Sequence, residues 1–257
     1  MFTETLTWGT LPAGFVKRTD SQGYRWVLRQ DRAHEIDFST DLDERSGLES
    51  SRYSGRARLS ALRLSDGETA LIRPYRHGGF FRAYTGAWFF TWPPRPFREL
   101  VITEELRRRG LPTVEVYAAC VSCSVLPFYR GWLVVRELSD SEDLWSALQS
   151  GFLQRVGFQA ALRAVAQSLR AMHREGVYHS DLNLKNILVR AEADRVVSYL
   201  IDFDKARLFL GKLPAELVKR NLDRLLRSAL KLDPERKFFP ASAWEEFLGF
   251  YHEAANG

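Results

Sequence analysis

The polar side chains best suited to chemistry lie in residues 179–186, which read HSDLNLKN, and at Asp202. Asp181 and Asn186 are five residues apart, and Asp202 follows Asp181 by 21 residues, directly after an apolar stretch. Phosphoryl transfer needs a carboxylate beside the acceptor hydroxyl, oxygen ligands for Mg²⁺ and cations on the phosphates. These three side chains meet the first two requirements, so we expect a phosphoryl-transfer site here.

The elements expected around this segment bring the three side chains together. Short strands over 186–189 and 196–202 are joined by a polar turn, which predicts a β-hairpin. The hairpin would place Asn186 beside Asp202, and both carry the hard oxygen ligands that Mg²⁺ prefers. Asp181 would then face the acceptor hydroxyl as a base or orienting group.

The same spacing is typical of the H-x-D-x-x-x-x-N and D-F-G elements of protein kinases, with Ser180 in place of Arg and Asp204 in place of Gly. In kinases that are switched by activation-loop phosphorylation, an Arg reads the new phosphate. Ser180 therefore favours a kinase that is not regulated in this way. His179 and Lys185 are catalytic-site candidates beside Asp181, and His179 is better explained as a packed, hydrogen-bonded scaffold residue than as a proton shuttle.

The N-terminal half predicts an antiparallel β-sheet with one helix. Apolar and polar side chains alternate over 56–61, a turn follows at 65–68, and 69–73 predicts a second strand, so this region indicates a hairpin. A helix is expected over 97–109, because its apolar residues recur with helical spacing and Gly110 follows as a stop signal.

The C-terminal half predicts mostly helices. Apolar residues spaced 4-3-4-3 over 158–172 mark one face of a helix, and further helices are expected over 214–232 and 244–252. We therefore predict an α+β, protein-kinase-like fold of two lobes. Residues 1–138 would form a β-rich, nucleotide-covering lobe, and residues 139–257 a mostly helical lobe that carries the catalytic loop.

The composition fits a globular cytosolic protein. The chain has 257 residues, 45% of them hydrophobic, and can bury a core. It has no apolar run of about 18 residues, and its first residues lack the pattern of a secretory signal. Cys120 and Cys123 have C-x-x-C spacing, but no second pair or nearby His completes a zinc site. We interpret them as structural residues in a reducing compartment.

Basic and aromatic side chains are concentrated in the N-terminal half. Residues 52–109 contain twelve Arg, no Lys and five acids, a balance of +7 within a net charge of +5 for the chain. Such a surface can meet phosphates, an anionic membrane or nucleic acid, or can simply be solvated. Residues 74–97 hold nine aromatics, which fit the core of a small lobe better than a platform for stacking on a base or sugar.

At these residues the chain resembles the lipopolysaccharide kinase family, which contains 3-deoxy-D-manno-octulosonic acid (Kdo) kinases and core heptose kinases. The resemblance covers most of the chain from about Ala70, and its R-x-Y-R-x-G-G and D-F-D-[KR] pieces are most similar to Kdo kinases. The segments that carry it are 71–79 (LIRPYRHGG), 95–99 (RPFRE), 109–114 (RGLPTV), the loop at 179–186, 202–207 (DFDKAR) and 220–225 (RNLDRL).

The resemblance implies ATP- and Mg²⁺-dependent phosphorylation of a sugar hydroxyl, on Kdo or heptose of a lipopolysaccharide inner-core or lipid A precursor. It also implies a cytoplasmic protein, peripheral on the cytoplasmic face of the bacterial inner membrane. The acceptor glycolipid and that membrane surface are both anionic, which suits the basic N-terminal half. No nucleic-acid partner is expected, and the sequence leaves the hydroxyl and the oligomeric state open.

The residues expected to bind ATP depart from the protein-kinase pattern. Arg73 stands where the V-A-I-K strand of kinases carries Lys. We expect Arg73 to contact the phosphates and to pair with Glu99 on the following helix. Arg76 is the alternative phosphate ligand, and Glu104 is the alternative partner if Glu99 faces away.

The loop expected to cover the nucleotide, residues 51–58, contains Gly55 alone instead of a G-x-G-x-x-G motif. Adenine is expected to bind main-chain groups of the strand that connects the two lobes. Glu137 and Leu138 are the best candidates for this contact.

Other functions remain open at this level. A protein kinase, or a small-molecule kinase of the aminoglycoside type, would use the same catalytic residues on another acceptor. A pseudokinase or a nucleic-acid-binding module would use the basic surface, although the intact Asp181, Asn186 and Asp202 argue against a dead enzyme.

Overall fold

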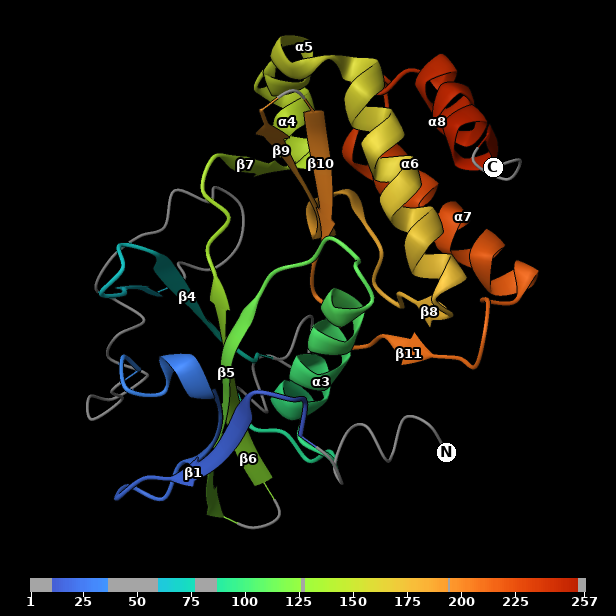
Figure 1. The fold of residues 1–257 in the computed structure, drawn as a ribbon. Coiled ribbons are helices and arrows are strands. Elements are labelled where there is room, and N and C mark those ends of the chain that lie inside the picture. Colours follow the sequence, from blue (N-terminus) through green and yellow to red (C-terminus); the bar gives the residue numbers. More distant parts are fainter. Residues whose placement is uncertain (1–10, 37–59, 77–86, 126–127, 194, 254–257) are drawn as a thin grey trace. The chain divides into compact units, whose positions relative to one another are not determined.

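The computed structural model of the chain describes residues 11–36, 60–76, 87–125, 128–193 and 195–253 (Figure 1). Within these ranges the chain forms two compact units. The first holds Thr3–Glu105 and Glu115–Glu137, and the second holds Leu106–Val114 and Leu138–Gly257. The assignment of 1–138 and 139–257 to a nucleotide-covering and a catalytic lobe stays a prediction.

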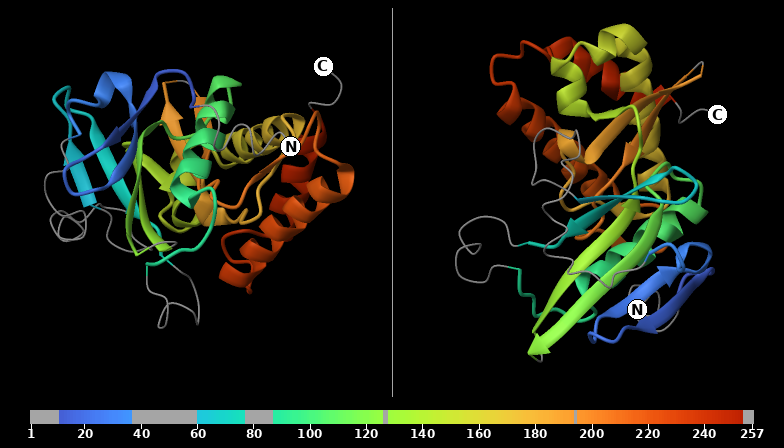
Figure 2. Two further views of the ribbon diagram at one scale, coloured as in Figure 1. Left: turned by 90° about the horizontal axis from the view of Figure 1, so that it is seen from below. Right: turned by 90° about the vertical axis from the view of Figure 1, so that its left-hand side faces the viewer.

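The first unit is built on a six-stranded antiparallel sheet with the strand order β1-β2-β5-β6-β4-β3. Its strands are β1 (Phe15–Thr19), β2 (Arg25–Arg29), β3 (Ser60–Arg63), β4 (Thr69–Pro74), β5 (Val116–Val125) and β6 (Phe128–Arg136). The right-hand view of Figure 2 shows β5 and β6 as a long hairpin. A 3₁₀ turn, η2 (Gln30–Arg32), follows β2.

Successive side chains of a strand point to opposite faces of the sheet, and each face carries a buried apolar cluster. Trp26 of β2 joins one core cluster with Trp132 of β6. Val27 joins the other cluster, together with Leu100 of helix α3 (Arg95–Arg108). The single helix of the expected β-rich half therefore packs its apolar side chains on one face of the sheet.

The two cysteines of β5 lie apart in this core. Cys120 is buried in the cluster around Trp26, whereas Cys123 packs against the cluster around Val27. Both are free thiols, and burial raises the pKa of Cys120.

The second unit is mostly helical. Its helices are α4 (Leu144–Gln149), α5 (Phe152–Val156), α6 (Phe158–Arg174), α7 (Ala215–Leu232) and α8 (Ala241–Glu253). Its strands are β7 (Ser141–Asp143), β8 (Val177–Tyr178), β9 (Ile187–Glu192), β10 (Arg195–Leu200) and β11 (Arg207–Leu208), paired in the orders β10-β9-β7 and β11-β8. The predicted hairpin is present as β9 and β10, whose register pairs Ile187 with Leu200.

Helix α6 is the centre of this unit. It buries Leu162, Val165, Leu169 and Met172, the face expected from the apolar spacing, and it packs against α8 and β10 (Figure 1). Full burial of a leucine or valine side chain contributes about 2 kcal/mol, so the burial of this face stabilises the packing of α6 in the unit.

Gly176 fixes how the chain leaves α6. Its φ is +72°, a conformation that favours glycine. A Cβ at this position would lie 2.2 Å from the main-chain oxygen of Gly211. The Phe209 N–H donates to the Gly176 carbonyl at 2.8 Å. The chain at Phe209 therefore contacts the turn between α6 and the catalytic loop.

Candidate active site

The loop that carries Asp181 is held by its own side chains. It runs from β8 to the 3₁₀ turn η5 (Leu184–Asn186). Asn183 begins that turn, where its Oδ1 accepts the Lys185 N–H at 3.0 Å and its Nδ2 donates to the Asp181 carbonyl at 2.8 Å. The Lys185 side chain is half-buried.

The main chain of Asp181 has two further contacts. Asn186 Nδ2 donates to the same carbonyl at 2.8 Å, and the Asp181 N–H donates to His179 Nδ1 at 3.3 Å. The Asp181 residue itself is exposed. A carboxylate on a fixed backbone and open to solvent can approach a substrate hydroxyl without a change in the loop.

His179 links this loop to Ile201, the residue before Asp202. The ring is 1% exposed, and its Nε2 lies 3.0 Å from the carbonyl of Ile201. A carbonyl only accepts, so Nε2 carries the proton and Nδ1 is the acceptor for the Asp181 N–H. Burial lowers the pKa of His179, and its ring packs on Phe203 at 5.2 Å. Both nitrogens are therefore engaged with main-chain groups of the site.

Asn186 and Asp202 are brought together by one hydrogen bond, in which the Ile201 N–H donates to the Asn186 carbonyl at 3.0 Å. Asn186 is fully buried, and its Nδ2 is directed at the Asp181 carbonyl. Asp202 has a φ of +68°, a left-handed conformation that costs about 1–3 kcal/mol for a residue other than glycine. Residues held in such conformations cluster at active sites.

This donor set fits Mg²⁺. An amide oxygen and a carboxylate are hard ligands, and Mg²⁺ usually takes one or two such side chains together with substrate phosphates and water. Among the described residues, no group of three His, Cys, Asp or Glu side chains forms a metal cluster by itself. Asn186 and Asp202 remain the residues that would hold the ion.

The sequence did not identify the side chains that hydrogen-bond to the His179 main chain and hold it in place. Asn221 of α7 is fully buried; its Nδ2 donates to the His179 carbonyl at 2.8 Å, and its Oδ1 accepts the His179 N–H at 3.2 Å. The same Oδ1 lies 3.2 Å from His173 Nε2, and His173 Nδ1 lies 2.7 Å from the Tyr251 hydroxyl. Side chains of α6, α7 and α8 thus fix the backbone of the catalytic loop.

The buried His173 predicts a loss of stability in acid. Burial lowers its pKa from 6.5 to about 4, so between these pH values the unfolded chain binds a proton that the folded chain does not. The stabilising contribution of the neutral His173 is fully present above pH 6.5. The free energy of unfolding falls by about 3 kcal/mol as the pH drops to about 4. Denaturant unfolding over this pH range should show a shallower dependence for His173→Gln than for the native chain. Equal slopes would contradict the assignment.

On the first unit, the residues expected to meet ATP are partly assembled. Arg73 of β4 forms an ion pair with Glu99 of α3, and the Tyr75 hydroxyl donates to the same Glu99 oxygen. The guanidinium groups of Arg73 and Arg95 lie 5.2 and 5.4 Å from the centre of the Tyr75 ring. The buried Glu99 carboxylate is therefore paired with the Arg73 guanidinium, and a second guanidinium, that of Arg95, lies on the same Tyr75 ring. The nucleotide role of Arg73 and Glu99 stays a prediction.

Glu104 and Arg76, the alternatives to Glu99 and Arg73, have different surroundings. The main-chain N–H of Val116 donates to Glu104 at 3.0 Å, and Arg29 approaches Glu104 at 3.6 Å, whereas Glu99 already meets Arg73. Arg76 is exposed.

The other nucleotide candidates are only partly described. The Glu137 N–H donates to the Thr69 carbonyl at 2.8 Å, and the Leu138 carbonyl accepts from Ser141 Oγ at 2.7 Å. The adenine contacts proposed for these two residues stay predictions. Gly55 lies outside the described residues.

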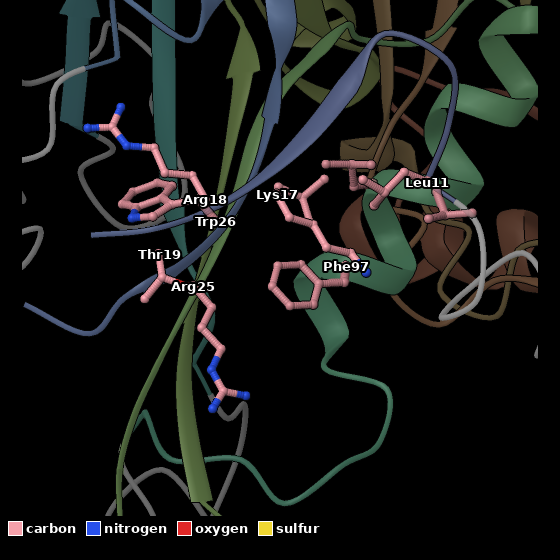
Figure 3. Close-up of a pocket in the computed structure, with 10 residues that line it drawn as sticks. Leu11, Lys17, Arg18, Thr19, Arg25, Trp26 and Phe97 are labelled. Atoms are coloured by element: carbon pink, nitrogen blue, oxygen red, sulfur yellow. The ribbon is translucent and has the colours of Figure 1, made fainter. Parts of the chain in front are cut away.

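A cavity of about 210 Å³ lies in the first unit beside α3, and Figure 3 shows its lining. Apolar side chains such as Leu11 and Phe97 form one part of it, and the guanidinium groups of Arg18 and Arg25 extend away from them. The lining residues are Leu11, Lys17, Arg18, Thr19, Arg25, Trp26, Val27, Phe97, Leu100 and Val101. Among the described residues, those that line the cavity include no carboxylate and no predicted site residue.

Known proteins that share these features identify the family. Residues 45–251, which contain every candidate site residue, match the lipopolysaccharide kinase (Kdo/WaaP) family. The chain belongs to this family. The resemblance inferred from the motifs is thereby confirmed.

Two curated relatives show the extent of the similarity. A 3-deoxy-D-manno-octulosonic acid kinase of Pasteurella multocida is 33% identical over 158 residues, 61% of this chain and 63% of the relative. One of Actinobacillus succinogenes is 31% identical over 200 residues, 76% of this chain and 80% of the relative. The first relatives are matched over just under two thirds of their length.

A solved structure, WaaP in complex with acyl carrier protein, aligns with 88% of each chain at a TM-score of 0.54 and 21% identity. This similarity concerns the fold, and together with the antiparallel sheet and the helices it confirms the α+β, kinase-like fold class. Among the described helices, none is long and apolar enough to cross a membrane.

Proposed function

We propose that this chain transfers the γ-phosphoryl group of ATP to a sugar hydroxyl of a lipopolysaccharide precursor, with Kdo as the favoured acceptor and heptose as the alternative. Asp181 is the main support, because its carboxylate is exposed on a loop whose backbone is held by His179, Asn183 and Asn186. Family membership supports the sugar acceptor, and the names of the curated relatives favour Kdo.

The proposed mechanism gives each residue a separate task. Asp181 orients the acceptor hydroxyl and accepts its proton as the oxygen attacks the γ-phosphorus. Asn186 and Asp202 would hold Mg²⁺, which would neutralise charge on the phosphates. Arg73 contacts the phosphates, its direction set by Glu99 and Tyr75. Lys185 lies four residues from Asp181 and is proposed to act on the same transferring group.

The proposed setting is the cytoplasmic face of the bacterial inner membrane. The acceptor is an anionic glycolipid, and residues 52–109 carry the excess of Arg that suits such a surface. We infer a peripheral association with this membrane.

An acceptor series tests the proposal. The protein is incubated with Mg-ATP and, separately, Kdo–lipid A, Kdo₂–lipid A, a heptosylated acceptor and a generic protein substrate. We expect a mass increase of one phosphate on a Kdo-containing glycolipid. Phosphate on the heptosylated acceptor alone would select the alternative sugar. Phosphate on protein, with none on any glycolipid, would refute the proposed substrate class.

A further inference from the structure

Three large aromatic side chains are exposed together on the first unit. Trp88, Phe90 and Phe128 are 36, 68 and 46% exposed; we call them the aromatic patch. Phe90 and Phe128 touch, with their ring centres 5.8 Å apart. Exposed apolar side chains are common singly, but a group of large aromatics on one surface indicates a binding site.

The alternation of buried and exposed residues explains how the patch is formed. Phe89 pairs with Tyr129, its N–H donating to the Tyr129 carbonyl at 2.8 Å and its own carbonyl accepting at 2.9 Å. Phe89 is 2% exposed. Since neighbouring residues of an extended chain face opposite sides, Trp88 and Phe90 are turned outward. The outward direction therefore follows from the backbone pairing.

The support beneath the patch is well packed. The Phe89 ring contacts those of Tyr75 and Tyr129 at 6.3 and 5.9 Å, and the Arg95 guanidinium lies 4.6 Å from its centre. The Arg95 N–H also donates to the Tyr129 hydroxyl at 2.9 Å. The segment is thus tied to the start of α3 and to β6, and it presents the aromatic patch from a fixed backbone.

The charged residues in the two segments that carry the patch have one sign. Residues 87–98 and 128–135 contain no Asp or Glu, but they contain Arg95, Arg98 and Arg130. Arg130 lies 6.0 Å from the Trp88 ring centre and 5.4 Å from that of Trp132. Aromatic rings bordered by Arg are the combination that enters the headgroup region of an anionic bilayer.

We propose that the aromatic patch docks this chain on an anionic bilayer, with its rings in the headgroup region and Arg130 beside lipid phosphates. This surface extends the proposed function, because a glycolipid acceptor is presented at such a bilayer. A second copy of the chain is a poorer occupant, because pairing two patches would bring the Arg130 side chains of both copies together.

Vesicle co-sedimentation of the full chain tests the docking surface. The variants are Phe90→Ser, Phe90→Ser/Phe128→Ser and Arg130→Gln. Leu210→Ser is the matched control, since Leu210 is a 77% exposed apolar residue of the other unit. On phosphatidylglycerol vesicles we expect a loss of affinity of about tenfold or more for the double variant and about fivefold for Arg130→Gln. Leu210→Ser should bind normally, and phosphatidylcholine vesicles should bind all chains weakly.

Three outcomes would overturn the docking proposal. The double variant could bind phosphatidylglycerol as tightly as the native chain, or Leu210→Ser could lose as much affinity. Light scattering could instead show a dimer that depends on Phe90 and Phe128. If circular dichroism shows that the double variant does not fold, the phosphatidylglycerol affinities of Phe90→Ser and Arg130→Gln are compared with that of the native chain instead. Native-like binding by both variants would then overturn the proposal.

Kinase assays separate this proposal from the proposed function. With a de-acylated, water-soluble Kdo acceptor, the double variant should turn over like the native chain, whereas with acceptor embedded in vesicles its rate should fall. If the native chain fails on both acceptors while vesicle binding still depends on the patch, the proposed function is wrong and the docking surface stands.

Discussion

Asp181→Asn should lower turnover by about 10²- to 10⁴-fold while ATP affinity stays the same. The substitution keeps the size of the side chain and removes its negative charge together with its ability to take a proton. The contacts that hold the loop use the main-chain N–H and carbonyl of Asp181, so the backbone should not move. Single-turnover transfer to the glycolipid measures the rate, and calorimetric titration with Mg-ATP measures binding.

Glu235→Gln is the matched control for this experiment. Glu235 is an exposed carboxylate of the same unit, between α7 and α8, and its loss should leave both measurements unchanged. Near-normal turnover of Asp181→Asn would show that another group acts on the acceptor hydroxyl. A parallel loss of ATP binding would show that Asp181 acts on the nucleotide side.

The second large effect is expected for Asn221→Leu, which should destabilise the chain by about 3 to 5 kcal/mol. Leucine fills a similar volume but can replace none of the three hydrogen bonds to His179 and His173. The main-chain N–H and carbonyl of the buried His179 would lose this partner, as would the His173 ring. Denaturant unfolding followed by circular dichroism measures the change.

A double-mutant cycle with His173→Leu controls for nonspecific damage. Because His173 and Asn221 are direct partners, the double variant should be less destabilised than the sum of the single variants. Additive effects, or a loss below about 1 kcal/mol for Asn221→Leu, would mean that this side chain does not support the loop.

The catalytic loop could be predicted from the sequence because its organisation is local. His179, Asp181 and Asn186 lie within eight residues, and Asp202 is joined to Asn186 through the hairpin of β9 and β10. Apolar strands on either side of a polar turn are sufficient to indicate such a hairpin.

Short or weakly patterned elements could not be predicted in the same way. β1 was not expected, since Phe15 is its only buried residue and the strand has no alternating pattern. α4 and α5 have six and five residues, too few to show a helical period. α3 begins at Arg95, two residues before the predicted start, because Pro96 is compatible with a first helical turn.

The support beneath the loop depends on tertiary contacts. Asn221 lies 42 residues after His179, and Tyr251 lies 78 residues after His173. RNLDRL at 220–225 was recognised as part of the family pattern, but which of its residues reaches the loop depends on how α7 packs. The sequence alone does not show that the Asn of this helix is buried.

Phosphate transfer to the glycolipid, run in parallel with the native chain and Asp181→Asn, tests both the proposed sugar-kinase activity and the role of Asp181. Each protein is incubated with Mg-ATP and Kdo–lipid A, and the lipid is analysed by mass spectrometry. We predict a gain of one phosphate on the sugar with the native chain and essentially none with Asp181→Asn over the same time. Equal gains with both proteins, or ATP consumption by the native chain without any phosphorylated glycolipid, would contradict the account.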